Sequence, residues 1–141
     1  MGYVIVNIRL KNTEDSGLHR RGFIPAEQVR SAEVPILVDT GAINICLNEE
    51  TVEQLGLVEL QKSIAHMADN TEREVSIVGP VDIQYGDRST TQRAIKLPRG
   101  SENLFGVIPL EDMDLSPIPT EGRLVHNSPK NTTFKILSPR Y

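Results

Sequence analysis

The stretch Ile36-Leu37-Val38-Asp39-Thr40-Gly41-Ala42 is the most informative part of this chain. Its three aliphatic residues are typical of a strand buried on both faces, and an acidic residue follows them directly. An ionised carboxylate at the end of a buried strand is costly unless it is hydrogen-bonded or shares a proton. Thr40 supplies a hydroxyl, and Gly41 permits a tight turn whose backbone N–H lies close to the carboxylate. Asp39 is therefore the first candidate for a catalytic residue.

The composition predicts a mostly β fold around this stretch. The chain has 141 residues, which is the size of one domain. Val and Ile together number 25 and Thr adds 9, against 6 Ala, and such an excess of β-branched residues favours strands. Lys and Arg number 15 against 19 Asp and Glu, for a net charge of −4. This balance argues against a nucleic-acid partner, because general nucleic-acid binding needs a basic face.

Apolar runs and cysteine usage predict the cellular location of the protein. The longest apolar run, residues 34–38, is far shorter than the roughly 20 residues that span a bilayer. Residues 1–10 lack the basic region and the cleavage site of a signal peptide. The lone Cys46 cannot form an internal disulfide and suits a reducing compartment. We expect a cytoplasmic protein with no membrane partner.

The N-terminal third predicts two strands joined by a long connection. Residues 3–10 alternate apolar and polar side chains, as a half-buried strand does. Residues 11–28 are polar and are broken by two glycines and a proline, which is typical of a loop. A second strand is expected over 29–33, and Pro35 is expected to separate it from the run 36–38.

The rest of the chain predicts one capped helix followed by hairpins. Asn48 is placed to cap a short helix, and Gly56 is placed to end it. Hairpins are expected over 63–78 and 80–97, with turns at Asp69-Asn70 and Gly86-Asp87. A second short helix is expected at about 109–114.

Other chemistries are poorly supported. The three histidines, His19, His66 and His126, are far apart in the sequence and show no metal-ligand spacing. Cys46 lies between aliphatic residues and is expected to be a small buried hydrophobe. The chain has no Gly-x-Ser-x-Gly elbow and no phosphate-binding loop. We therefore expect neither a metal nor a cofactor.

Three separated segments resemble one family. Residues 36–42, the helix end Leu55-Gly56-Leu57, and the later Leu104-Phe105-Gly106 together resemble the retropepsin-like aspartic peptidases. That family comprises retroviral proteases and small single-domain relatives in bacteria and archaea. The resemblance covers roughly residues 3–115 and is closest to the microbial relatives. It implies a closed, barrel-like fold with one or two short helices, working as a two-fold symmetric homodimer.

The resemblance also assigns roles to residues around Asp39. Asp39 would be the catalytic carboxylate, and the Asp39 of each subunit would share one proton with the other, because two carboxylates so close cannot both ionise. Thr40 would bond across to the partner's loop. Gly41 and Ala42 would line the floor of a groove for a polypeptide substrate. Leu104, Phe105 and Gly106 would cross behind the catalytic loop and support it.

The hairpin over 63–78 would be a flap that closes over a peptide held as an extra strand. Its turn residues would contact the substrate: Ala68, Asp69, Asn70 and Thr71. Two features depart from the family pattern. The turn reads Asp69-Asn70, where relatives often have Gly, and Val107-Ile108-Pro109 replaces the Arg-Asp pair that braces retroviral dimers.

We therefore divide the chain into a peptidase domain over 1–115 and a C-terminal tail over 116–141. The tail is a candidate for the dimer interface, because residues 134–137 have strand character. The leading hypothesis is an aspartic endopeptidase. The first alternative is a dimeric peptide-binding module of the same fold with little or no catalysis. The second alternative is an unrelated β-barrel in which Asp39 only caps backbone amides.

Several charged residues are expected to be plain surface groups. Asp15-Ser16-Gly17 repeats the Asp-Ser/Thr-Gly pattern without an aliphatic strand before it, so we expect a surface turn. Arg20, Arg21 and Arg88 are expected to be solvated loop charges. The acidic residues Glu111, Asp112 and Asp114 are expected on the solvated face of a helix, because calcium-loop spacing is absent.

Overall fold

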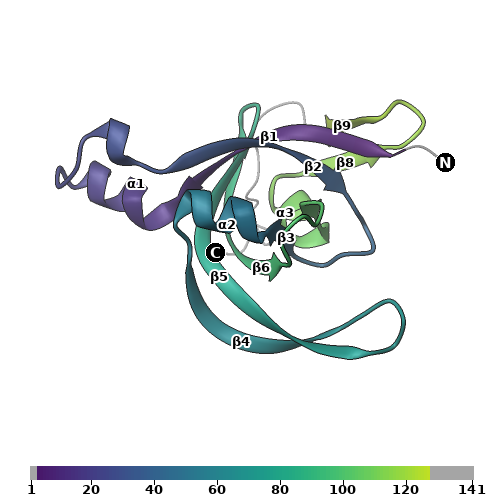
Figure 1. Cartoon of the computed structure of the whole chain (residues 1–141). Helices are drawn as coiled ribbons and strands as arrows, with labels where there is room; N and C mark the ends of the chain where they lie inside the picture. Colours follow the sequence, from purple (N-terminus) through teal and green to yellow (C-terminus); the bar gives the residue numbers. More distant parts are fainter. Residues whose placement is uncertain (1–2, 128–141) are drawn as a thin grey trace, which may run out of the picture.

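The computed structural model describes residues 3–127, which form a mostly β structure around a closed six-stranded barrel (Figure 1). The barrel strands, in order around it, are β1 (Val4–Asn12), β2 (Ser31–Val38), β7 (Leu104–Phe105), β3 (Ile45–Asn48), β6 (Arg88–Leu97) and β5 (Glu72–Tyr85). It closes because β5 also pairs with β1. A further strand, β4 (Val58–His66), pairs with β5 at the edge of the sheet.

Short helices and a second hairpin complete the described part. These are α1 (Thr13–Arg20), the 3₁₀ turn η1 (Ala26–Gln28), α2 (Glu49–Leu55), α3 (Val107–Asp112) and the hairpin of β8 (Leu115–Ile118) with β9 (Arg123–His126). None of the helices within residues 3–127 is long and apolar enough to cross a membrane.

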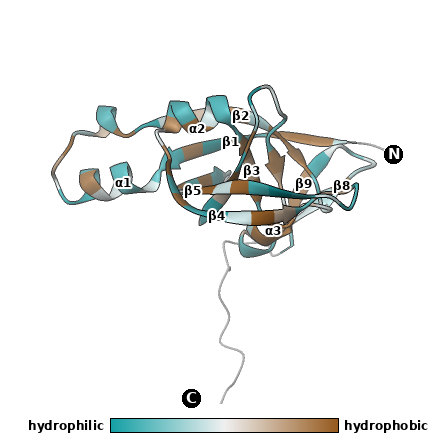
Figure 2. Cartoon of the chain, turned by 60° about the horizontal axis from the view of Figure 1, so that its bottom comes forward, coloured by the Kyte–Doolittle hydropathy of each residue, from teal (hydrophilic) through white to brown (hydrophobic). Residues whose placement is uncertain are grey.

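The core fills the barrel, and the apolar residues of the strands supply it (Figure 2). On β1, the buried Ile8 and Leu10 alternate with the exposed Arg9, as the two-residue period of a strand requires. Burial of such an aliphatic side chain contributes about 1.5–3 kcal/mol. Leu115 and Leu124 belong to the same core, so the β8–β9 hairpin packs against the barrel.

Several predicted elements are confirmed. The alternating segment forms β1, which runs on to Asn12. Asn48 caps α2 by accepting a hydrogen bond from the Thr51 N–H at 2.9 Å, and Gly56 ends that helix with a φ of 62°. Both hairpins form, and Tyr85 pairs with Arg88 across a two-residue turn. The predicted second helix is displaced and covers Val107–Asp112.

Two predictions about the N-terminal third are wrong. The expected connection over 11–28 contains α1 and η1, because the buried Asn12 side chain caps α1 by accepting from the Asp15 N–H at 3.0 Å. Pro35 does not interrupt β2 but lies opposite Asn7 inside the ladder. The Leu37 N–H points toward the β7 side. The nitrogen of Pro35, two residues earlier, faces the same side and carries no N–H. Pairing with β7 begins only at Leu37, so no donor to β7 is needed at Pro35.

Three expected surface groups are buried or paired. Asp15 lies in α1 rather than in a surface turn, is 7% exposed, and accepts from Arg30 Nε at 2.8 Å, Arg30 Nη2 at 3.0 Å and the Arg30 N–H at 3.0 Å. Arg88 is fully buried, not solvated, and donates from Nη1 to the Met113 carbonyl at 3.1 Å. It also lies 3.7 Å from Asp114, which is thus an ion-pair partner rather than a solvated charge.

Candidate active site

Asp39 is the first residue after β2, in a loop over 39–44 that leads into β3. The loop begins with a tight turn in which the Ala42 N–H donates to the Asp39 carbonyl at 3.0 Å. Within that turn the Gly41 N–H donates to Asp39 Oδ1 at 2.9 Å, as the sequence predicts. Asp39 Oδ2 has no hydrogen-bond partner among the described residues, so it is available to a water molecule or a ligand.

Glycine at position 41 keeps space beside this carboxylate. A Cβ added there would lie 3.1 Å from Asp39 Oδ1, tighter than nine in ten real Cβ contacts. With any other residue at position 41, the carboxylate would have to shift by a few tenths of an ångström.

Strand β7 and the residues that follow it hold the loop over 39–44 through backbone hydrogen bonds. Leu104 and Phe105 pair in parallel with Leu37 and Val38, and the Asp39 N–H donates to the Phe105 carbonyl at 3.1 Å. On the far side of the loop, the Val107 N–H donates to the Ala42 carbonyl at 3.0 Å. The loop is thus tied to the chain around residues 105–107 at both ends of its turn. The structure thus places Leu104–Gly106 against the Asp39 loop, and their role in supporting an active site stays a prediction.

Gly106 makes that close approach possible. A Cβ at this position would overlap the backbone of loop 39–44, at 2.7 Å from the Ile43 carbonyl carbon and 2.8 Å from the Ala42 oxygen, and nearer still to the Asn44 oxygen. The φ of Gly106 is −86°, so steric space rather than backbone freedom requires glycine here.

A buried asparagine braces the same region and was not predicted from the sequence. Asn103 is 6% exposed, and its Oδ1 accepts from the Asn48 N–H at 2.8 Å. Its backbone carbonyl accepts from the Leu37 N–H at 2.9 Å, and its Nδ2 donates to Thr51 Oγ1 at 3.3 Å. One residue thereby joins β2, through its backbone, to β3 and the start of α2, through its side chain. Its position before Leu104 is the only sequence signal, and that signal is weak.

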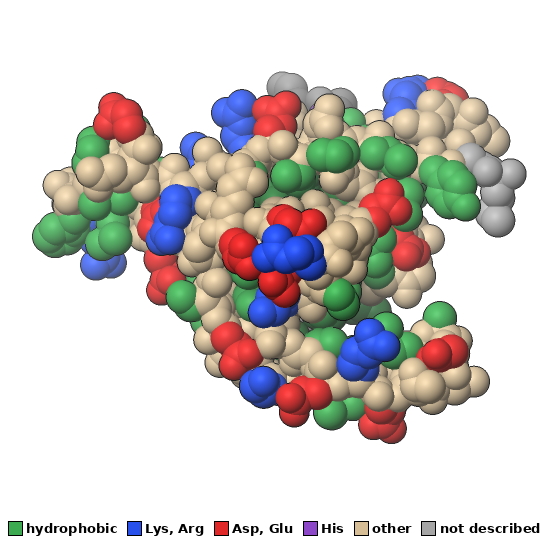
Figure 3. Space-filling model, viewed as in Figure 1, with side chains coloured by type: hydrophobic (Ala, Val, Ile, Leu, Met, Phe, Trp, Pro, Cys, Tyr) green, Lys and Arg blue, Asp and Glu red, His purple; other side chains and the backbone are tan. Residues whose placement is uncertain are grey.

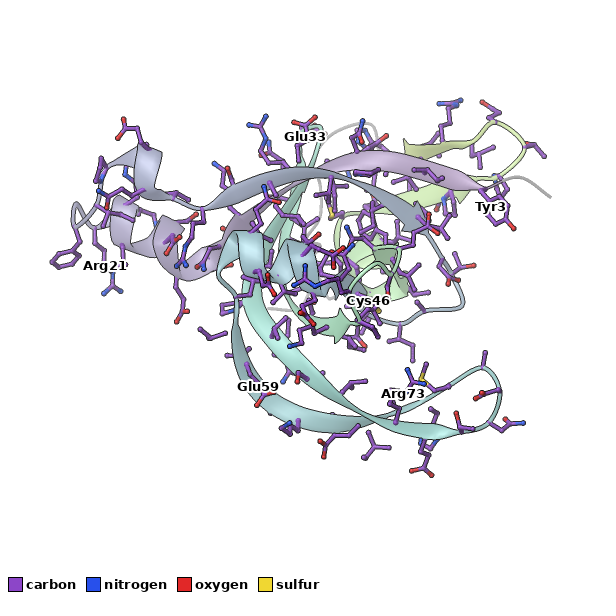
Figure 4. All side chains as sticks on the ribbon, viewed as in Figure 1. Tyr3, Arg21, Glu33, Cys46, Glu59 and Arg73 are labelled. Carbon is purple, nitrogen blue, oxygen red and sulfur yellow. The ribbon has the colours of Figure 1, made fainter. Side chains whose placement is uncertain are left out.

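Cys46 lies on β3, between the core residues Ile45 and Leu47, and is 7% exposed (Figure 4). Burial, and secondarily the negative charge of Asp39, raise the pKa of the Cys46 thiol to about 11. The prediction of a small buried hydrophobe is confirmed. Cys46 is protonated at neutral pH and is unsuited to act as a nucleophile.

The outer side of the loop is exposed. Thr40 is exposed, and its hydroxyl makes no hydrogen bond within residues 3–127. Beside it, Ile43 is 65% exposed and Ile108 is 40% exposed. A cavity of about 810 Å³ lies between α1 and strands β1, β5 and β6, and no residue of the loop lines it. Asp39 thus lies at an open surface with apolar residues beside it, rather than in that cavity.

The four predicted flap residues form the turn between β4 and β5. The Met67 N–H donates to the Thr71 carbonyl at 2.8 Å, and Asn70 has a φ of 67°, a conformation that asparagine tolerates. Asp69 Oδ1 accepts from the Thr71 N–H at 3.0 Å and from the Thr71 hydroxyl. These bonds, the hydroxyl bond foremost, lower the pKa of Asp69.

The β4–β5 hairpin curves away from the barrel (Figure 1) and leaves a hollow between itself and the body (Figure 3). Its tip lies on the same side of the molecule as loop 39–44 (Figure 1). In the described chain, no hydrogen bond or ion pair joins residues 68–71 to residues 39–42. The structure therefore brings Asp39, Thr40, Gly41 and Ala42 together with Leu104–Gly106, and places the turn across an open space from them.

Within residues 3–127, no three His, Cys, Asp or Glu side chains are grouped as metal ligands. Comparison of the chain with models of known protein families and with curated protein sequences finds no match.

Proposed function

We propose that this chain is a retropepsin-like aspartic endopeptidase that works as a homodimer with one Asp39 from each subunit. The observation that carries the proposal is the loop around Asp39. One carboxylate oxygen is fixed by the Gly41 N–H, the other is open, and the backbone of residues 105–107 ties the loop in place. Such pre-organisation suits a group that must hold a reacting water.

A second copy supplies what one chain lacks. The sequence contains two Asp-Ser/Thr-Gly tripeptides, and Asp15 of the other one is already bonded to Arg30. A pair of carboxylates therefore requires Asp39 from two subunits, related by a two-fold axis as in most homodimers. The exposed Thr40 hydroxyl and the apolar Ile43 and Ile108 beside it fit burial against such a copy.

The chemistry follows from the shared proton. A bound water attacks the peptide carbonyl and gives a proton to the ionised Asp39. The protonated Asp39 of the other subunit donates its proton to the carbonyl oxygen at the same time. The tetrahedral intermediate then collapses: the Asp39 that took the water proton gives it to the leaving nitrogen, and the other Asp39 takes back a proton from a hydroxyl of the intermediate as the new carboxyl group forms. The β4–β5 hairpin would cover the peptide and exclude bulk water during these steps.

The alternative function is a dimeric peptide-binding module with little or no catalysis. The observation that favours it is the hairpin turn, which Thr71 fastens to Asp69 through backbone and side-chain hydrogen bonds. A turn fastened in this way moves less readily than a glycine turn. For either function we propose a cytoplasmic location, because the lone buried thiol fits a reducing compartment.

The test compares wild type with Asp39→Asn on a denatured protein mixture across about pH 4 to 7, where such carboxylate pairs titrate, with fragments identified by mass spectrometry. We expect cleavage by wild type alone and unchanged circular dichroism for the variant. Equal cleavage by both proteins would rule out the proposed dyad. Cleavage by neither, with dimers and peptide binding observed, would favour the binding module.

A further inference from the structure

The β4–β5 hairpin has two different faces. Partners in an antiparallel ladder point to the same side, so Arg73, Val75 and Ile77 share one face with Ala65 and Ser63. The strand period puts Glu74 and Ser76 on the other face, together with their partners Ile64 and Lys62. Ser63 and Ala65 are half-buried, whereas Lys62 and Ile64 are exposed. The Arg73 face is therefore the one turned toward the body.

Figure 4 agrees with this assignment, because Arg73 lies on the side of the hairpin that faces the hollow. Apolar side chains lie both on this face of the hairpin and beside the Asp39 loop. Val75 and Ile77 are half-buried on the hairpin, and Ile43 and Ile108 are exposed beside the Asp39 loop.

The two cations of the hairpin differ in their partners. Lys62 Nζ lies 3.6 Å from Glu74 and 3.9 Å from Glu59, so its charge is balanced on the outer face. Arg73 forms no ion pair within residues 3–127. Asp69 of the nearby turn directs Oδ1 to Thr71, and the charge of Arg73 is only the last of the causes that lower the pKa of Asp69, so the two groups interact without forming an ion pair. A positive charge without a salt-bridge partner therefore faces the hollow, which favours a ligand with a negative side chain.

The position of Arg73 along the hairpin limits where the negative side chain of a bound peptide can lie. Arg73 is three residues from Asn70 at the tip, or about 10 Å along a strand. If the tip covers the scissile bond, as the proposed flap would, an extended peptide covers that distance in about three residues.

We infer that Arg73 determines specificity, so that the preferred substrates are peptides with Asp or Glu within about three residues of the scissile bond and apolar side chains next to it. The inference rests on the proposed function, because it assumes that the peptide lies beneath the hairpin. It adds to that function the chemical class of the substrate.

The first test profiles cleavage of a peptide library derived from a whole proteome by wild type, Arg73→Glu and Lys62→Glu. Lys62→Glu is the matched control, since it makes the same charge reversal on the outer face of the same hairpin. We expect wild type to enrich Asp and Glu near the cut about threefold to fivefold, as an exposed ion pair allows. Arg73→Glu should lose this preference and favour Lys or Arg, whereas Lys62→Glu should retain it.

The second test does not need catalysis. Two synthetic peptide pools with the same apolar centre, one flanked by Glu and the other by Gln, are bound to Asp39→Asn and to the double variant with Arg73→Glu. We expect Asp39→Asn to bind the Glu pool about threefold more tightly, with the difference lost at high salt or with Arg73→Glu.

The outcomes separate the two proposals. Cleavage that depends on Asp39 but has no acidic preference, or a preference that survives Arg73→Glu, overturns this inference and leaves the peptidase standing. Preferential binding of the Glu pool without any cleavage supports this inference and counts against the peptidase. Equal binding of both pools, or of neither, overturns the inference.

Discussion

Asp15 and Asp39 begin the same Asp-Ser/Thr-Gly pattern and occupy opposite environments. Asp15 lies in a helix, is 7% exposed, and accepts three hydrogen bonds from Arg30. Asp39 lies in a loop, is partly exposed, and accepts one bond from the Gly41 N–H. An aspartate whose oxygens are all bonded stabilises the fold, whereas one with an open oxygen can bind a reacting molecule. The neighbours of the tripeptide therefore distinguish the two roles.

The largest predicted effect is that of Gly106→Ala, because this change disturbs the loop that holds Asp39. It leaves the surroundings of Asp15 unchanged. Gly106→Ala would force the backbone at Ala42 and Ile43 to move, since the new Cβ has no space. Displacement of a catalytic group by about 1 Å costs on the order of 10²-fold in activity. We also expect about 1–3 kcal/mol of lost stability from overpacking. Peptide cleavage and urea unfolding measure the two effects.

Gly17→Ala is the matched control for that variant. A Cβ at Gly17 meets only Arg20 Nη2 at 3.7 Å, and the residue lies in α1. Alanine should therefore add about 0.5–1 kcal/mol of stability and leave activity unchanged. If Gly106→Ala is as active as Gly17→Ala, the loop is not held as described.

Asp15→Asn should act on stability and not on activity. The amide keeps the volume of the carboxylate but loses the charge that Arg30 neutralises and part of its acceptor capacity. We expect the free energy of unfolding to fall by about 2 kcal/mol, the cost of leaving buried polar groups poorly paired. A variant as stable as wild type would remove the distinction between the two aspartates.

The pH dependence of the free energy of unfolding should show the contribution of the Asp15–Arg30 ion pair. Hydrogen bonds from the Arg30 side chain lower the pKa of Asp15 below its ordinary value of 3.8. Ionised Asp15 therefore stabilises the fold fully above its unfolded pKa, and this contribution is lost as the pH falls through the lowered folded pKa. Urea midpoints of wild type and Asp15→Asn should converge as the pH falls below about 4. Parallel curves would contradict the ion pair.

The smallest predicted effect is that of Asp39→Asn on the pKa of the Cys46 thiol. With a pKa of about 11, this thiol should react with iodoacetamide at pH 8 about a hundredfold more slowly than an unfolded cysteine. Asp39→Asn removes the secondary cause of the shift, so the thiol pKa should fall slightly and remain high because burial dominates. A large increase in reactivity would mean that the charge of Asp39, rather than burial, controls this thiol.

Local patterns account for the parts of the fold that were predicted. Alternation along β1, the cap at Asn48, the end at Gly56 and the turns at Asp69-Asn70 and Gly86-Asp87 all depend on residues close in sequence. Helix α1 escaped prediction although its Asn12 cap is local, because residues 13–20 show no apolar periodicity and Asp15 is bonded to the distant Arg30. The burial of Arg88 likewise depends on Met113 and Asp114, which no local pattern places beside it.

In the candidate site, too, some features were predicted from the sequence and others were not. The motif predicted the Asp39 turn, and the family resemblance implied that Leu104–Gly106 would lie behind it. The brace formed by Asn103 was missed, because its partners Asn48 and Thr51 lie more than fifty residues earlier. The dyad, the role of the hairpin in binding peptide and the tail stay predictions. Residues 134–137 and the rest of the proposed tail beyond residue 127 lie outside the described chain.

The most direct test of the proposed dyad mixes wild-type and Asp39→Asn subunits. Equal amounts are unfolded together, refolded so that subunits combine at random, and assayed for peptide cleavage at fixed total protein. If each active site needs Asp39 from both subunits, only wild-type homodimers cleave, and activity falls to about one quarter of that of wild type. An activity of about one half would mean that each chain acts by itself, and would contradict the shared dyad.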